Sequence, residues 1–264
     1  MSGLPAGYFI PGNSFLDFLR SQAPGALDAA FRLGAAAPSA AELPPTSTTI
    51  VALAYRDGVV MAGDRRATQG HQIASREVEK VFPADATTAI GLAGVAGLAA
   101  QLVRLYQLEL EHYEKIEGAA LSVQGKANRL ATMLRSQLEL ALRGLVALPL
   151  LAGWDAAPPG SPPRGRIFSF DVAGGTYEER AYAAVGSGAV FAKGSLKALY
   201  KPNATARTAI RAALTALADA ADEDTGTAGV DRRRAIYPVV ARVDARGYAR
   251  LPDHELAKLV GEGS

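Results

Sequence analysis

Three positions in the first third of the chain carry residue types that could perform hydrolysis: Thr48, Asp64 and Lys80. A threonine hydroxyl is a poor nucleophile unless a base lies beside it. A carboxylate beside a lysine holds the ammonium group in place and keeps it charged. Each residue also has an ordinary structural explanation, as a strand residue, a turn former and a solvated charge. The three therefore indicate a catalytic site only in combination.

Most other catalytic classes are excluded by composition and spacing. The chain has no cysteine, which removes thiolate nucleophiles, disulfides and cysteine-ligated zinc. None of its three histidines is spaced from another like a zinc-ligand pair: His71, His112 and His254. The Gly-Ser-Gly segment 186–188 lacks the G-x-S-x-G pattern of a serine-hydrolase nucleophile elbow. The glycines at 91, 94 and 97 do not indicate a nucleotide-binding loop, because they lack the G-x-G-x-x-G spacing and a Walker lysine.

Bulk composition indicates an ordinary globular protein. The 264 residues are 49% hydrophobic and 20% charged, and the formal net charge of +2 is too small to indicate a nucleic-acid partner. The basic triplet 232–234 follows the acidic triplet 222–224, so it is expected to be a solvated surface.

No apolar run approaches the roughly 20 residues that span a bilayer, and Asp17 and Arg20 interrupt any secretory signal. We expect a cytoplasmic protein.

The composition changes near residue 48. Residues 1–47 are rich in Ala, Pro, Gly and Ser, and three prolines between Pro38 and Pro45 prevent a continuous helix or a central strand. This stretch is predicted to be an appendage. From Thr48 onward a β-branched apolar run predicts a strand over 48–55, a turn over 56–58 and the second arm of a hairpin over 59–64.

The remaining pattern alternates strands with pairs of helices. Strands are predicted near 80–82 and 87–93, followed by two helices whose apolar stripes run from 99 to 113 and from 130 to 145. Strands over 148–152, 166–171 and 177–185 come next, with a Pro-rich loop over 155–164. Helices over 189–200 and 206–222 and a strand pair over 236–244 and 248–251 complete the chain. This order predicts two sheets with helices on their outer faces.

Three segments are distinctive: residues 60–66 (VMAGDRR), 110–115 (LEHYEK) and 147–153 (ALPLLAG). Together with Thr48, Asp64 and Lys80 they resemble the β-subunits of the proteasome, in particular those of actinobacteria, and the resemblance runs from Thr48 to the C-terminal region. It implies an α+β fold of the N-terminal-nucleophile hydrolase type, a four-layer αββα sandwich of two antiparallel sheets flanked by helices. It also implies a propeptide over 1–47 and a catalytic domain over 48–264, with cleavage between Ser47 and Thr48.

The resemblance assigns catalytic roles to Thr48, Asp64 and Lys80. Cleavage would make Thr48 the N-terminus, so its α-amine, with an ordinary pKa of about 7.7–8, could serve as general base to its own hydroxyl. Lys80 would stabilise the developing alkoxide, and Asp64 would keep Lys80 charged. Gly94 would supply the backbone N–H of an oxyanion hole.

Further residues match positions around the amine and the substrate. Ser187 and Asp231 match a polar pair beside the α-amine. Thr68 matches a residue that pairs with the substrate backbone. Four apolar residues match the pocket for the side chain before the cut, which favours hydrophobic substrates, although they could equally be core residues: Ala67, Val78, Leu92 and Ala96.

Two positions depart from the family pattern. Ser47 stands where family precursors usually carry glycine, which fits the tight turn of self-cleavage best, so we expect slower self-processing. Arg234 stands where many relatives place a serine near the amine.

The sequence therefore predicts a threonine endopeptidase subunit of a self-compartmentalised proteasome that cleaves unfolded proteins and needs no metal or organic cofactor. The implied partners are α-subunits and other β-subunits, in heptameric rings stacked α-β-β-α, and a ring ATPase. A structural β-subunit that assembles without cleaving is the alternative, supported by Ser47. A simpler two-ring threonine protease is a third possibility, against which the 63–66 segment and the long C-terminal portion argue.

Overall fold

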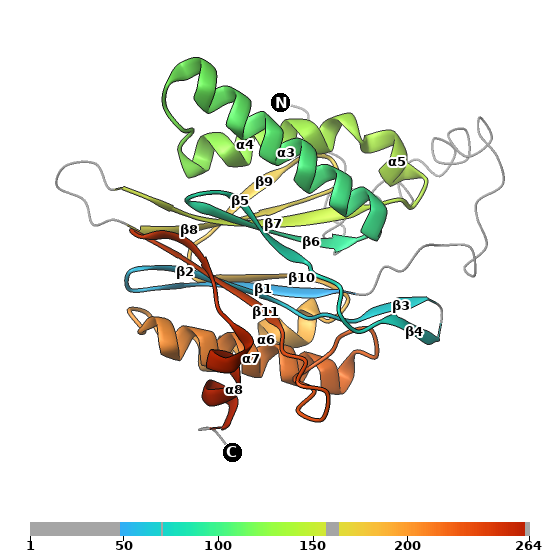
Figure 1. Ribbon diagram of the computed structural model, residues 1–264. Helices are drawn as coiled ribbons and strands as arrows, with labels where there is room; N and C mark the ends of the chain where they lie inside the picture. Colours follow the sequence, from blue (N-terminus) through green and yellow to red (C-terminus); the bar gives the residue numbers. More distant parts are fainter. Residues whose placement is uncertain (1–47, 70, 157–163, 262–264) are drawn as a thin grey trace, which may run out of the picture.

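Two antiparallel sheets lie face to face and carry helices on both outer faces (Figure 1). The computed structural model describes residues 48–69, 71–156 and 164–261. This architecture confirms the predicted α+β fold with two sheets between two helical layers. The predicted propeptide and most of the predicted Pro-rich loop lie outside the described residues.

Each of the two large sheets has five strands. The first has the order β10-β1-β2-β11-β12 and the second the order β5-β6-β7-β8-β9. The strands of the first sheet are β10 (Tyr182–Gly186), β1 (Thr49–Tyr55), β2 (Gly58–Gly63), β11 (Val239–Asp244) and β12 (Gly247–Arg250). Those of the second are β5 (Val81–Asp85), β6 (Thr88–Gly94), β7 (Ala147–Asp155), β8 (Arg164–Phe170) and β9 (Thr176–Glu179). A small hairpin of β3 (Ala67–Gln69) and β4 (Gln72–Ser75) stands apart from both.

The helices divide between the two outer faces (Figure 1). The second sheet is covered by α3 (Ala96–Glu117) and α4 (Val123–Ser136), with the short α5 (Leu138–Leu142) on the same side. The first sheet is covered by α6 (Ala189–Leu199) and α7 (Ala206–Glu223), with α8 (Asp253–Gly261) at the C-terminal end. The side chain of Ser122 accepts a bond from Gly125 N and so caps the start of α4.

Apolar side chains fill three layers, one between the sheets and one beneath each helical face. Strand β1 shows how the sequence achieves this. Ile50 and Ala52 lie between the sheets, whereas Val51 and Leu53 pack toward α6 and α7. Successive residues of a strand point to opposite faces, so a strand that is buried on both faces reads as a continuous apolar run. That is the pattern from which the strand was predicted.

The structure differs from the sequence prediction in several elements. The single strand predicted over 177–185 is two strands, β9 and β10, which belong to different sheets because the chain crosses between the layers after Glu179. The helix predicted to follow α3 is divided at Gln137 into α4 and α5. Strand β11 begins at Val239 rather than near 236, since Pro238 has no N–H for a sheet ladder. The β3–β4 hairpin and α8 were not predicted.

Core packing leads to a stability prediction. Leu151 is fully buried on the central strand β7, beneath α3 and α4, whereas Leu108 on α3 is 54% exposed. Leu151→Ala should lower the free energy of unfolding by about 2–5 kcal/mol, because the cavity cannot close fully in a strand with neighbours on both sides. Leu108→Ala should change it by about 0.5 kcal/mol or less. Urea unfolding curves of the two variants check this, and equal midpoints would contradict the described core.

Candidate active site

The candidate catalytic residues gather at one end of the sandwich. Thr48 directly precedes β1, Asp64 directly follows β2 and Lys80 directly precedes β5. The antiparallel pairing of β1 with β2, which sets Ile50 opposite Gly63, brings the start of one strand beside the end of the other. All three residues are buried, with 4%, 0% and 4% of their surface exposed.

An ion pair joins the two sheets at this end. Lys80 Nζ lies 2.7 Å from Asp64 Oδ1 and also donates to the carbonyl oxygen of Arg66 at 2.5 Å. Burial lowers the pKa of Lys80, and the charge and hydrogen bond of Asp64 oppose that shift. The pair is therefore a buried charge pair whose carboxylate favours the protonated form of the lysine.

The Asp64 carboxylate also fixes the backbone around it. Its Oδ1 accepts a bond from Thr49 N at 2.8 Å, and its Oδ2 accepts from Arg66 N at 2.9 Å and from Ala228 N at 3.2 Å. With Lys80, the carboxylate thus accepts four hydrogen bonds, which offset the cost of burying its oxygens.

Thr48 is anchored through its carbonyl group. Ser187 N donates to Thr48 O at 2.9 Å, and Ser187 Oγ lies 3.4 Å from the same oxygen. Close approach of the strand β10 depends on Gly186, whose φ is +108°. A Cβ at that position would lie 1.8 Å from Thr48 O.

The acidic partner of Ser187 is Asp224, not the predicted Asp231. Ser187 Oγ donates to Asp224 Oδ2 at 2.6 Å, and Thr227 Oγ1 donates to the same oxygen at 2.5 Å. The Thr227 hydroxyl in turn lies 2.6 Å from the hydroxyl of Thr49, which accepts a bond from Gly188 N. A continuous polar network therefore connects Asp224 to the residue that follows Thr48.

Asp231 contacts Arg234 and Ile236 among the described residues, and its predicted place beside the α-amine stays a prediction. Its two carboxylate oxygens accept bonds from the backbone N and the guanidinium of Arg234, and it pairs through its backbone with Ile236. These bonds close a local turn. Arg234 is therefore a partner of Asp231, and the hydroxyl beside Asp224 is supplied by Thr227 instead.

The surroundings of Asp224 keep its carboxylate charged. Burial alone would raise the pKa of Asp224, but bonds from Ser187, Thr227 and Gly226 N, together with the charge of Lys80, hold it below its ordinary value. Sequence reasoning missed this residue because it reads as the end of an acidic triplet. The available signal was the Asp-Thr-Gly-Thr segment, since an aspartate two residues before a glycine commonly accepts the glycine N–H in a turn.

Gly94 lies where the second sheet leads into α3, and its role as an oxyanion donor stays a prediction. It ends β6 two residues before α3 begins, and its φ is +121°. A Cβ here would lie 2.0 Å from Val146 O, so only glycine fits. A strand end that leads into a helix N-terminus favours negative charge nearby.

The predicted substrate-binding residues lie close to Lys80 in the chain or the sheet. Leu92 N donates to Lys80 O at 3.0 Å, and Val78 N donates to Arg65 O at 3.1 Å. Leu92 packs in the core beneath α3, Ala67 is buried on β3, Val78 and Thr68 are partly buried, and Ala96 is exposed at the start of α3. Their contact with substrate stays a prediction.

Among residues 48–69, 71–156 and 164–261, no group of three or more histidine or carboxylate side chains is placed to hold a metal ion. No helix in these ranges is long and apolar enough to cross a membrane.

Comparisons with known proteins identify the family to which this chain belongs. A family model described as "Proteasome subunit" matches residues 45–232. The chain is 53% identical over 255 residues to a "Proteasome subunit beta" of Jonesia denitrificans, covering 97% of this chain and 82% of that protein. It is 51% identical over 260 residues to a "Proteasome subunit beta" of Acidothermus cellulolyticus, covering 97% and 88%. This chain therefore belongs to the proteasome subunit family, among its β-subunits and close to actinobacterial relatives.

Proposed function

We propose that this β-subunit is a threonine endopeptidase whose nucleophile is Thr48, freed by removal of residues 1–47. The observation that carries the proposal is the buried Asp64–Lys80 ion pair, which shares Asp64 Oδ1 with the backbone N–H that directly follows Thr48. A buried charge pair is a costly feature in a core, and its position beside a candidate nucleophile favours catalysis over a purely structural role.

The chemistry follows from the groups around Thr48. Once the bond to Ser47 is cut, the α-amine of Thr48 accepts the hydroxyl proton as Oγ1 attacks the carbonyl carbon of a peptide bond. The C–N bond then breaks, and the proton passes to the leaving amine, which leaves an ester on Thr48. Water hydrolyses this ester, with the same amine as base, and restores the hydroxyl. Lys80 stabilises the oxygen as it loses its proton, and the backbone N–H of Gly94 stabilises the tetrahedral oxyanion.

Ser187 and Asp224 position the amine in this proposal. Ser187 already bonds to the carbonyl oxygen of Thr48, so its hydroxyl lies beside the residue whose amine must be oriented. The Asp224 carboxylate holds that hydroxyl and adds negative charge near the amine and Lys80. Negative charge stabilises the protonated amine that forms during attack.

The family sets the context of this activity. Subunits of a proteasome assemble with one another, and we propose stacked α-β-β-α heptameric rings that receive unfolded proteins from a ring ATPase. The apolar side chains of Ala67, Val78, Leu92 and Ala96 support a preference for a hydrophobic residue before the cut.

Replacement of the nucleophile gives the direct test. Thr48→Ala removes the attacking oxygen, so assembled particles should keep residues 1–47 and lose peptidase activity by a factor of about 10³ or more. Thr48→Ser keeps a hydroxyl and should retain both processing and measurable turnover. Intact mass spectrometry, N-terminal sequencing and labelling with an epoxyketone directed at N-terminal threonine provide the readouts. A wild-type particle that assembles but neither processes nor labels would be the structural β-subunit instead.

The acidic partner of Ser187 gives a second test. Asp224→Asn removes the charge that holds Ser187 and Thr227, and should lower kcat/KM about 10–100-fold, the equivalent of one charge-assisted hydrogen bond. Asp231→Asn is the matched control, because its exposed bond to Arg234 closes only a local turn, and it should lower kcat/KM less than about threefold. If Asp231→Asn lowered kcat/KM more than Asp224→Asn, Asp231 would be the acidic residue that positions the amine.

The ion pair predicts the form of the pH dependence. The rate of attack by Thr48 should rise with pH as its α-amine loses a proton near the ordinary pKa of about 7.7–8. It should fall again at higher pH, where the ammonium group of Lys80 loses its proton. Burial lowers the pKa of Lys80, so this alkaline fall should occur below the ordinary lysine value of about 10.4. Asp64→Asn removes the opposing charge, and the fall should move to still lower pH.

Rates of epoxyketone labelling across a pH series measure this profile on assembled particles. Asp57→Asn is the control, since Asp57 is exposed and pairs with its neighbour Arg56. If the labelling rate of Asp64→Asn particles falls at the same alkaline pH as that of wild type, Lys80 does not act as the required cation.

A further inference from the structure

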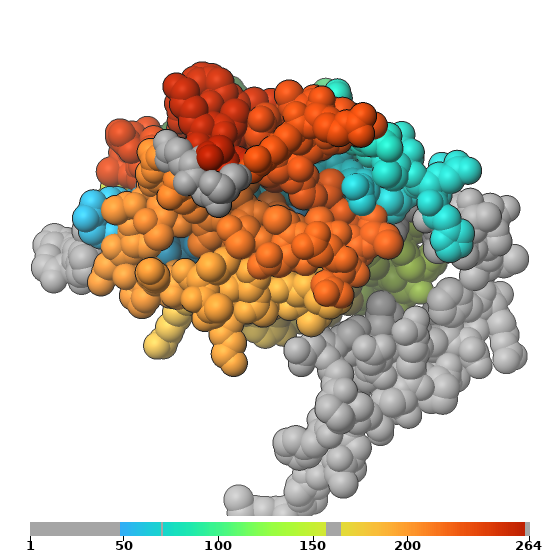
Figure 2. Space-filling model, turned by 90° about the horizontal axis from the view of Figure 1, so that it is seen from below, coloured from blue at the N-terminus to red at the C-terminus, as the bar shows by residue number. Residues whose placement is uncertain are grey.

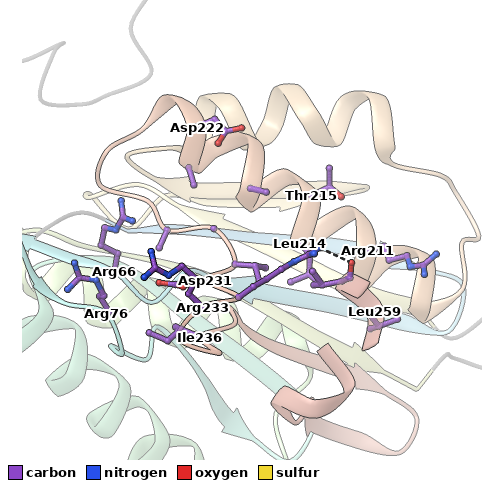
Figure 3. Close-up of a pocket in the computed structure, with 17 residues that line it drawn as sticks. Arg66, Arg76, Arg211, Leu214, Thr215, Asp222, Asp231, Arg233, Ile236 and Leu259 are labelled. Carbon is purple, nitrogen blue, oxygen red and sulfur yellow. Dashed lines mark hydrogen bonds between the residues drawn. The ribbon is translucent and has the colours of Figure 1, made fainter. Parts of the chain in front are cut away.

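An arginine-lined groove opens beside the candidate active site, on the face of the molecule that carries α7 and α8 (Figure 2). Its volume is about 810 Å³, within the range of small-molecule sites. One wall is α7, another is the segment 228–233 that follows it, and α8 contributes Leu259 and Val260. The close-up in Figure 3 shows Arg66 and Arg76 on one side of this view and Arg211 on the other.

The charges of the groove are strongly unbalanced. Five arginines and two aspartates line it, and one of those aspartates, Asp231, already pairs with Arg234 outside the lining. The arginines are Arg66, Arg76, Arg211, Arg232 and Arg233. Guanidinium groups bind phosphate and carboxylate oxygens through two parallel hydrogen bonds, so several of them around a concave surface create a site for an anion of more than one charge.

Arg66 links this groove to the catalytic residues. Its guanidinium Nη1 donates to Thr225 O at 3.0 Å, while its Nε is buried and has no hydrogen-bond acceptor among the described residues. Its backbone points the other way: Arg66 N donates to Asp64 Oδ2, and Arg66 O accepts from Lys80 Nζ. A ligand that moves this residue or neutralises its side chain therefore acts directly on the Asp64–Lys80 pair.

We propose that the groove binds a small anion that carries more than one phosphate group, and that Arg66 transmits its binding to Lys80. The groove is larger than one phosphate ion requires, and its apolar residues Leu214, Ile236 and Leu259 can contact a less polar part of such a ligand. The binding site stands on its own geometry, whereas the effect on Lys80 rests on the proposed peptidase function.

The direction of the effect follows from the groups that face Lys80. Asp64 and Asp224 raise the pKa of Lys80, whereas the positive charge of Arg66 lowers it. An anion bound to Arg66 offsets that positive charge, so Lys80 should keep its proton to higher pH.

Binding is tested without catalysis on assembled particles that carry Thr48→Ala, with inorganic tripolyphosphate as the probe and calorimetry as the measurement. Arg211→Gln and Arg233→Gln should each weaken binding at least about tenfold, since each removes one charge-assisted contact. Arg104→Gln is the matched control: Arg104 is an exposed arginine of α3, on the opposite outer face, and its loss should change affinity less than twofold. Ionic strength is held constant with chloride, because weak surface binding of anions depends on salt.

The results separate the site from the proposed function. Absence of saturable binding, or equal binding by all three variants, would overturn the anion site even if Thr48 proves catalytic. If both groove variants failed to assemble while Arg104→Gln particles formed, the groove would be a contact between subunits and the proposal would be wrong.

The coupling has its own readout on active particles. Saturating tripolyphosphate should raise the alkaline pH at which the rate of epoxyketone labelling falls, in wild type and in Arg104→Gln. In Arg233→Gln this pH should stay the same. If this pH does not change in wild type although binding is measured, the link through Arg66 is overturned.

Discussion

A single buried carboxylate organises the end of this molecule that holds the candidate catalytic residues. Asp64 follows a strand of the first sheet, and its partner Lys80 precedes a strand of the second, so their 2.7 Å contact joins the two layers. The same carboxylate accepts backbone bonds from Thr49, Arg66 and Ala228. Breaking a buried pair of this kind leaves an uncompensated charge, which is strongly unfavourable. The ion pair therefore fixes the relative position of the sheet ends as well as the protonation of the lysine.

The surrounding fold supplies the rigidity that this pair requires. Strands β1 and β2 are buried on both faces, so neither can shift without disturbing two core layers at once. The residues with catalytic chemistry sit just beyond the ends of these strands, where the backbone leaves the ladder and side chains can converge. Glycines at 94 and 186 allow the two closest backbone approaches at this end. Precise packing in the layers thus positions polar groups that lie outside them.

Much of the fold could be predicted from the sequence because local signals agree with the tertiary structure. The first hairpin combines β-branched strands with an Arg-Asp-Gly turn, and α3 shows a clear apolar stripe. The division of 177–185 between two sheets could not be predicted, because side chains alternate between the two faces in the same way along strands of either sheet. Asp64 and Lys80 are found by motif, whereas Asp224 and Asp231 stand seven residues apart in one irregular segment. Which of them approaches Ser187 depends on turns that the sequence pattern does not specify.

The anchoring of Thr48 and Thr49 has a consequence for the proposed removal of residues 1–47. The carbonyl of Thr48 is held by Ser187, and Thr49 is held through its N–H and its hydroxyl by Asp64, Gly188 and Thr227. Every one of these bonds involves an atom on the C-terminal side of the peptide bond between residues 47 and 48. Cutting that bond would remove none of them, so the framework around the proposed nucleophile does not depend on residues 1–47 being removed. The proposed cleavage would expose one amine within a scaffold that need not rearrange.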